Sequence, residues 1–304
     1  MNTRRTFLKS SIALAAVATL DLPVKKDKQK LSFSTLGCPK WTLTEIVKTA
    51  AKEGYDAVEI RGLQGELYLP KCPEFSTPEQ IASTRKLFAD HKIKICNLGA
   101  STALHQLDAE KRKKNLDEGR AFIDLAQQLG CPYVRVFPND LPKDQDREKT
   151  IDMIGEGLLE LANYAKGKNV IVLLESHGEV IWKDMLLRIM KQAEHPNVGL
   201  IWDIFNMWSV TKEPPAEVYA ALKKYIRHAH IKDGRLVDGK LAYTFIGKGE
   251  APLTEAINAL EGGGYKGYYS FEWEKMWHPE IPEPELAFPD YPAAIKPYFN
   301  VGRR

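Results

Sequence analysis

From Leu31 onward the chain repeats one pattern eight times: a short run rich in β-branched and aromatic residues, a turn, and a helical stretch. Most runs are bounded by Gly, Pro, Asn or Asp, as is typical of strands. The predicted strands are Leu31–Leu36, Ala57–Arg61, Ile93–Leu98, Tyr133–Phe137, Val170–Glu175, Val198–Asp203, Ile226–Ile231 and Gly267–Trp273. Strict alternation of strands and helices favours a parallel sheet with right-handed crossovers. Eight units over about 274 residues predict an α/β fold, a single closed (β/α)8 TIM barrel, rather than an open doubly wound sheet.

Helix boundary signals lie between the predicted strands. Thr77-Pro78-Glu79 supplies a cap, a first-turn proline and an acid that suits the helix dipole. The predicted helices are Thr44–Glu53, Ile81–His91, Ala109–Leu129, Asp146–Lys166, Lys183–Ala193, Pro215–Tyr225, Leu253–Leu260 and Ala293–Phe299. Asp233–Pro252 is long for a connection and contains a turn-like Asp238-Gly239, so we expect a small hairpin or flap there. No GxGxxG motif follows the first strand, which weakens a dinucleotide-binding alternative.

The N-terminus has the features of an export signal. Arg4-Arg5-Thr6-Phe7-Leu8-Lys9 precedes an uncharged, Ala-rich run, so residues 1–20 are predicted to be a twin-arginine signal peptide. The lysine-rich residues 21–30 are expected to form a linker, and residues 31–304 the barrel domain. This interpretation predicts an exported, periplasmic protein.

Composition excludes several classes of protein. Hydrophobic residues make up 44% of the chain, which is incompatible with a disordered chain. No uncharged apolar stretch approaches the roughly 20 residues that span a bilayer, so no membrane association of the mature form is expected. The net charge of +3 gives no reason to expect nucleic-acid binding. The four cysteines have no zinc-ribbon spacing; export leaves one disulfide open, between Cys38 and Cys72, and otherwise four buried or semi-buried thiols are expected.

Acidic residues and one histidine stand at the ends of four consecutive predicted strands. They are Glu175 in Leu-Glu-Ser-His, Asp203 in Trp-Asp, His230 in His-Ile-Lys-Asp and Glu272 in Phe-Glu-Trp. In a (β/α)8 barrel these ends meet at one face, where catalytic residues gather. Three carboxylates in or beside apolar runs would repel one another unless a cation neutralised them, although each alone could be paired with a Lys or Arg. A mixed oxygen and imidazole ligand set predicts one divalent metal ion and does not choose among Mn²⁺, Mg²⁺, Co²⁺ and Zn²⁺.

These four motifs resemble those of the xylose isomerase-like barrels of the sugar phosphate isomerase/epimerase family. The resemblance extends from Leu31 to Phe299 and is strongest in the second half. It implies that Glu175, Asp203, His230 and Glu272 are metal ligands. It also implies that Glu175 and Glu272 are catalytic, moving a proton beside a substrate carbonyl through an enediolate. A Lewis-acidic ion suits that chemistry.

Further residues are expected to contact a small carbohydrate substrate. His177 and Lys232 each lie two residues beyond a predicted ligand. The alternative for His177 is a histidine in a surface loop, and the alternative for Lys232 is an ion pair with Asp233 or Glu250. The weaker candidates are Glu59, His105 and Trp41. Asn206 stands where ketose epimerases of the family often have histidine, and Arg235 where they have an arginine at slightly different spacing.

Three functions remain open at this point. The first is a metal-dependent isomerase or epimerase acting on a free sugar or keto-sugar, since export argues against a phosphorylated metabolite. The second is a lyase or hydratase using the same enolate chemistry, for example β-elimination from a 3-keto-glycoside, which product analysis would separate from the first. The third is a carbohydrate-binding barrel without catalysis, which an absence of metal would favour. A homodimer is compatible with the fold class, and no segment locates its interface.

Overall fold

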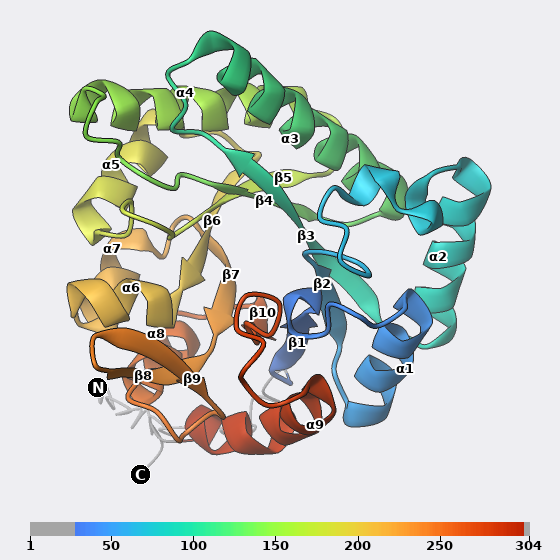
Figure 1. The fold of residues 1–304 in the computed structure, drawn as a ribbon. Coiled ribbons are helices and arrows are strands. Elements are labelled where there is room, and N and C mark those ends of the chain that lie inside the picture. Colours follow the sequence, from blue (N-terminus) through green and yellow to red (C-terminus); the bar gives the residue numbers. More distant parts are fainter. Residues whose placement is uncertain (1–27, 301–304) are drawn as a thin grey trace, which may run out of the picture.

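The computed structural model of the chain describes residues 28–300. The predicted signal peptide and most of the predicted linker lie in residues 1–27, outside the described range. Within that range, eight strands close into a parallel barrel in the order β1-β10-β7-β6-β5-β4-β3-β2. Figure 1 shows the helices as a ring around this barrel. The predicted fold class is therefore confirmed.

The barrel strands occupy the predicted positions with small shifts at their ends. They are β1 (Lys30–Ser34), β2 (Ala57–Ile60), β3 (Lys94–Ala103), β4 (Tyr133–Phe137), β5 (Ile171–Glu175), β6 (Val198–Asp203), β7 (Ile226–Ile231) and β10 (Tyr268–Phe271). The larger difference is in β3, which continues five residues past the predicted end at Leu98 and pairs at Ala103 with Phe137 of β4.

The helices follow the strands as expected. They are α1 (Leu43–Glu53), α2 (Pro78–Asp90), α3 (Ala109–Leu129), α4 (Arg147–Tyr164), α5 (Lys183–Gln192), α7 (Pro215–Leu222), α8 (Leu253–Gly262) and α9 (Pro284–Ile295). The last helix begins nine residues before its predicted start at Ala293, accommodates Pro289 and Pro292, and ends in a 3-10 turn at Lys296–Asn300. One helix was not predicted: α6 (Ile204–Thr211) follows β6 directly, because Asp203 caps it by accepting from the Asn206 N–H at 3.0 Å.

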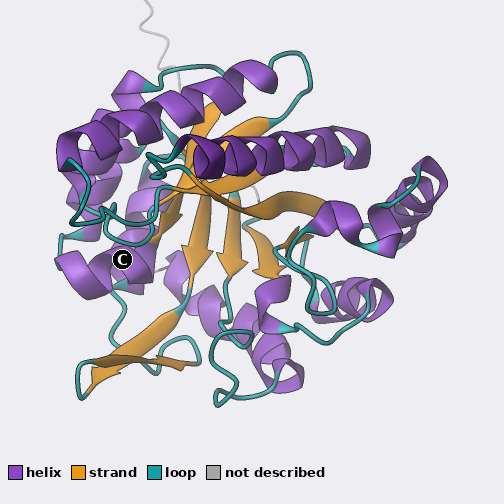
Figure 2. Cartoon of the chain, turned by 45° about the horizontal axis from the view of Figure 1, so that its top comes forward, coloured by secondary structure: helices purple, strands orange, loops and turns teal. Residues whose placement is uncertain are grey.

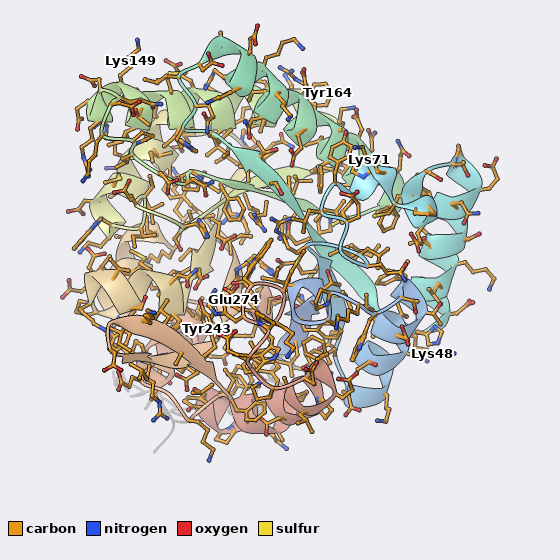
Figure 3. All side chains as sticks on the ribbon, in the orientation of Figure 1. Lys48, Lys71, Lys149, Tyr164, Tyr243 and Glu274 are labelled. Atoms are coloured by element: carbon orange, nitrogen blue, oxygen red, sulfur yellow. The ribbon has the colours of Figure 1, made fainter. Side chains whose placement is uncertain are left out.

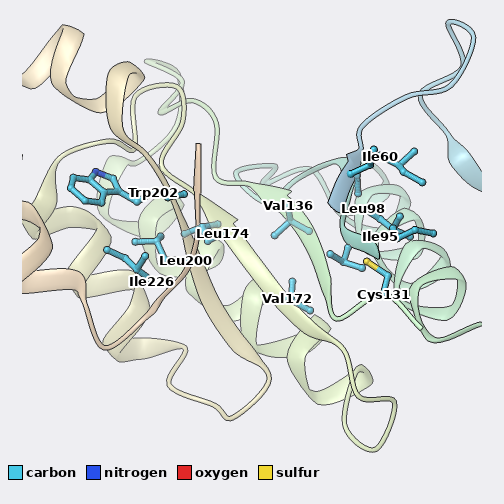
Figure 4. Close-up of a cluster of buried hydrophobic side chains, with 14 of the residues drawn as sticks. Ile60, Ile95, Leu98, Cys131, Val136, Val172, Leu174, Leu200, Trp202 and Ile226 are labelled. Atoms are coloured by element: carbon cyan, nitrogen blue, oxygen red, sulfur yellow. The ribbon is translucent and has the colours of Figure 1, made fainter. Parts of the chain in front are cut away.

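The core lies between the strands and the ring of helices. Figure 4 shows part of it, where apolar side chains of neighbouring strands, such as Ile60, Leu98, Val136, Leu174 and Leu200, gather in one layer. All five are fully buried. This layer leaves the opposite face of each strand free to direct polar side chains into the barrel.

The predicted hairpin is present between β7 and α8. Its strands are β8 (Asp233–Val237) and β9 (Lys240–Thr244), which pair antiparallel. Asp238 and Gly239 both have positive φ, 50° and 76°, as a two-residue hairpin turn of type I′ requires. Figure 2 shows this hairpin extending away from the barrel.

Two further expectations concern cysteines and membranes. Cys38, Cys72, Cys96 and Cys131 are all buried free thiols, so the disulfide left open for the first two is not formed. Across residues 28–300, no helix combines the length and apolar character needed to cross a bilayer.

Candidate metal centre

Four side chains at the carboxyl ends of consecutive strands converge on one point. One ligand atom from each of Glu175, Asp203, His230 and Glu272 lies within 4.8 Å of the other three. From His230 Nδ1 the distances are 3.2 Å to Glu272 Oε1, 3.6 Å to Glu175 Oε1 and 4.0 Å to Asp203 Oδ2. The four residues are between 0% and 4% exposed. The structure thus brings together the four residues that the sequence singles out.

The donor atoms fit a divalent ion. Two ligand atoms about 2.1 Å from one ion lie at most about 4.2 Å apart. The three distances from His230 fall within this limit, and the remaining pairs lie within 4.8 Å. His230 Nδ1 is buried and has no hydrogen-bond partner within the described chain, whereas Asp203 Oδ2, also buried, lies 2.8 Å from Lys232 Nζ. A buried polar atom without a partner is costly, and an ion coordinated by His230 Nδ1 would relieve that cost.

Glu59 fixes the orientation of the histidine. Its Oε2 lies 3.1 Å from Nε2 of His230 and 2.9 Å from Nε2 of His228. Burial would raise the pKa of Glu59, but His230 and His228 outweigh it and hold that pKa below its usual range. The carboxylate therefore accepts a hydrogen bond from each Nε2, which leaves His230 Nδ1 as the atom directed at the other ligands. Glu59 lies behind a ligand, so its expected role as a substrate contact is not what the geometry shows.

Glu175 and Glu272 share one arrangement. Each has Oε1 toward His230 Nδ1 and Oε2 toward a buried cation: Glu175 Oε2 is 3.1 Å from Arg135 Nε, and Glu272 Oε2 is 2.6 Å from Lys232 Nζ. Burial raises the pKa of each carboxyl, but these cations and His230 lower it by more, so the pKa of both carboxyls lies below the usual value. Both glutamates are therefore ionised at neutral pH.

Lys232 is buried among three carboxylates. Its Nζ lies 2.8 Å from Asp203 Oδ2, 2.6 Å from Glu272 Oε2 and 2.6 Å from Glu274 Oε1. Burial would lower the pKa of Lys232, but these carboxylates raise it well above its usual value, so the side chain is an ammonium ion. Burial raises the pKa of Asp203 to about 7, against the opposing charge of Lys232.

The ion pairs proposed as the alternative for Lys232 are not formed. Asp233 instead accepts four backbone N–H groups at the base of the hairpin, from Gly234, Gly247, Gly249 and Ala251, at 2.8–3.0 Å. The structure places Lys232 beside the candidate metal ligands, as its substrate-contact interpretation requires.

Two other predicted contacts border the same site. His177, half-buried after β5, has Nδ1 3.1 Å from Asn139 Oδ1 and its ring 4.4 Å from that of Phe137. Burial lowers the pKa of His177, so it is neutral at pH 7. Asn206 is half-buried in the first turn of α6, where its backbone N–H caps onto Asp203.

Three predicted contacts are engaged elsewhere. Arg235 is exposed on the hairpin and donates to the carbonyl of Lys248, so its expected role as a substrate contact finds no support in the geometry. Trp41 donates from Nε1 to Glu285 Oε1 at 3.2 Å, on the rim. His105 is buried after β3, and its Nε2 lies 2.8 Å from Nε2 of Gln106.

Three charged residues of the site were missed by the sequence reasoning. They are Glu274, Arg135 and Arg61, all less than 9% exposed. Figure 3 shows Glu274 and Tyr243 near one another, below and to the left of the centre of the view, and the Tyr243 ring centroid lies 5.8 Å from the Lys232 ammonium. The signal for Arg135 was available, because an arginine between Val134 and Val136 interrupts a buried strand in the same way as the acids do.

Comparison with known proteins places the chain among related barrels. Residues 47–294 match the family described as xylose isomerase-like TIM barrel. The inosose isomerase of Halalkalibacterium halodurans is 24% identical over 251 residues, covering 78% of this chain and 84% of the relative. The 3-dehydroshikimate dehydratase of Pseudomonas putida is 26% identical over 178 residues, which cover 58% of this chain and 26% of that longer protein.

A solved structure with the same fold holds a metal. The structure of the IOLI protein with a bound zinc atom superposes with a TM-score of 0.73 at 22% identity, covering 90% of this chain and 97% of that one. At this identity, the likeness establishes the fold.

Proposed function

The chain belongs to the xylose isomerase-like TIM barrel family, and we propose that it is a metal-dependent isomerase or epimerase of a small polyhydroxylated carbonyl compound. One observation carries the proposal: three carboxylates and an imidazole converge at the carboxyl ends of the strands, and the buried His230 Nδ1 at their centre lacks a hydrogen-bond partner within the described chain. Relatives named as inosose isomerases support this class of chemistry.

Glu175, Asp203, His230 and Glu272 would hold the ion. The ion would supply a Lewis acid for the substrate carbonyl oxygen and for the negative charge that develops there. Its identity stays open among Mn²⁺, Mg²⁺, Co²⁺ and Zn²⁺, and the zinc of the IOLI protein is one precedent.

Glu175 and Glu272 would move the proton. Arg135 and Lys232 keep them ionised, as a proton acceptor must be. Glu175 is the last residue of β5 and Glu272 directly follows β10, and β6 and β7 lie between these two strands in the barrel. Two carboxylates on separate strands can act from different sides of a bound substrate. Removal of the proton beside the carbonyl by one and its return from the other inverts that carbon, whereas return to the neighbouring carbon isomerises the substrate.

A dehydratase is the second candidate. Asn206 stands where a titratable histidine would be expected for ketose epimerisation, and a 3-dehydroshikimate dehydratase is among the relatives. Glu274, whose pKa burial raises above its usual value, lies 2.6 Å from Lys232 and could protonate a hydroxyl that leaves after the first proton transfer. Export to the periplasm by the N-terminal signal is part of the same proposal, and it favours a substrate found outside the cytoplasm.

The test is solvent exchange and product analysis. The protein, loaded with Mn²⁺, Co²⁺ or Zn²⁺, is incubated in D₂O with a panel of ketoses, keto-glycosides and cyclic polyhydroxy ketones, in neutral and in acidic forms. An isomerase or epimerase gives deuterium beside the carbonyl and a product of unchanged composition, whereas a dehydratase gives a product lighter by one water. Absence of both from every substrate would contradict the proposal.

A further inference from the structure

Two arginines are buried side by side on the β2–β4 side of the barrel mouth. Arg61 follows β2 and is 5% exposed; Arg135 lies in β4 and is 1% exposed. Between them, on β3, is Gly99, where a Cβ atom would lie 2.7 Å from Arg61 Cδ and 2.9 Å from Arg135 Nη2. Both side chains thus pass over the glycine into the same region, and any larger residue would push them apart.

Arg135 is held in place but not saturated. Its Nη1 donates to the carbonyl of Ala100 at 2.9 Å, and its guanidinium lies 3.7 Å from the ring centroid of Phe137. Its Nε is 3.1 Å from Glu175 Oε2 but not aligned for a hydrogen bond, and both atoms lack a partner within the described chain. Of the five N–H donors of this guanidinium, only one makes a hydrogen bond inside residues 28–300.

Arg61 has weaker partners. Its Nη2 donates to Ser101 Oγ at 3.2 Å and its Nη1 to the Gly99 carbonyl at 3.5 Å. No carboxylate of the described residues is within 4.0 Å of it; Glu118 instead accepts from the Ser101 N–H at 2.7 Å. Burial, and then the charge of Arg135, lower the pKa of Arg61 to about 9. Two buried like charges with one carboxylate in contact leave positive charge to be balanced.

The pair adjoins the candidate metal centre. Arg135 contacts Glu175 directly. The ring of Phe137 lies against the Arg135 guanidinium, and it also packs 4.4 Å from the ring of His177. Guanidinium groups with unused, forked donors and an aromatic platform are suited to planar or tetrahedral oxyanions. A molecule whose carbonyl faces the four metal ligands could therefore place a second group against the arginines.

We propose that Arg61 and Arg135 form a binding site for an anionic group, a carboxylate or a phosphate, carried by the substrate. The inference rests on the proposed function for the location of the reacting carbonyl. It narrows the substrate from neutral sugars to acidic ones. Export, as proposed above, favours a sugar acid or a hydroxylated cyclic keto acid, and a sugar phosphate is the alternative that the binding test distinguishes.

The test is calorimetric binding to the full protein, with and without Mn²⁺, using matched probes. These are D-glucuronate against D-glucose, D-galacturonate against D-galactose, and D-glucose 6-phosphate. Arg61→Met removes the guanidinium, with its charge and its paired N–H donors, without changing a candidate metal ligand. Arg61→Lys keeps the charge but loses the paired donors. Arg85→Met, an exposed residue of α2, removes the same charge from a distant surface.

We expect at least one acidic probe to bind about ten-fold or more tightly than its neutral counterpart. Arg61→Met should abolish the preference, Arg61→Lys should weaken it, and Arg85→Met should retain it. A preference for the uronates identifies a carboxylate, and one for the phosphate ester a phosphate. Equal binding of acidic and neutral probes in every pair, or a preference unaffected by both Arg61 variants, would overturn the proposal. Binding requires no turnover, so a lack of isomerase or dehydratase products would count against the proposed function alone.

Discussion

Replacement of Lys232 by methionine should destabilise the protein in a way that depends on metal. The change removes an ammonium ion that lies within 2.8 Å of Asp203, Glu272 and Glu274, all buried. Breaking a buried ion pair by removing one partner costs about 3–5 kcal/mol. For a domain of this size, about 2–4 °C per kcal/mol predicts a fall in Tm of roughly 6–20 °C.

The metal dependence follows from shared carboxylates. Lys232 and a divalent ion would both neutralise Asp203 and Glu272, so the ion should stabilise the protein more when the lysine is absent. Saturating Mn²⁺ should therefore raise the Tm of Lys232→Met by more than that of the native protein, as measured by calorimetry with and without the ion.

Lys275→Met is the matched control. Lys275 is also a buried lysine, but its Nζ donates to the carbonyls of Pro279 and Ile281 and pairs with Glu283, an exposed acid. Its loss should lower stability without changing the response to Mn²⁺. Equal responses to Mn²⁺ in the two variants and the native protein would refute the argument that Lys232 and the ion neutralise the same charges.

Two further predictions concern His230. Glu59→Gln should weaken metal binding by about 10- to 100-fold, because the amide no longer fixes the Nε2–H tautomer; titration with a competing chelator measures this, and an unchanged affinity would exclude the role. Burial lowers the pKa of His230, but Glu272, Glu59 and Glu175 raise it well above its usual value. In the metal-free protein His230 is therefore an imidazolium at pH 7, with a proton on Nδ1 as well as on Nε2. A metal ion must displace the Nδ1 proton, so metal affinity should rise with pH below the pKa of His230, by up to about ten-fold per pH unit. Calorimetry in buffers of different ionisation enthalpy should detect about one proton or more released as the metal binds. Affinity independent of pH between 6 and 8 would contradict this.

The strand ends could be predicted because each apolar run breaks at a polar residue. Asp203 and Glu175 end such runs, and closure of the barrel brings these ends to one face. The same rule would have found Arg135, a charge inside the run of β4. It could not show that Arg135 reaches Glu175, because that contact depends on the register between neighbouring strands and on the course of a long side chain.

Other features required the third dimension. The role of Glu59 depends on two histidines about 170 residues away, and the partners of Lys232 come from β6 and from the residues after β10. Helix α6 escaped prediction because its apolar sequence continues that of β6, and only the cap at Asp203 marks the boundary.

Metal content tests the central claim most directly. The purified native protein is loaded with Mn²⁺, Co²⁺ or Zn²⁺, dialysed and measured by elemental mass spectrometry beside Glu272→Gln, which removes a ligand charge. Glu274→Gln is the control, because this buried carboxylate contacts Lys232 but is not among the four ligands. We expect about one ion per chain in the native and control proteins and a clear loss in Glu272→Gln. No uptake by the native protein, or equal uptake by all three, would contradict the metal centre.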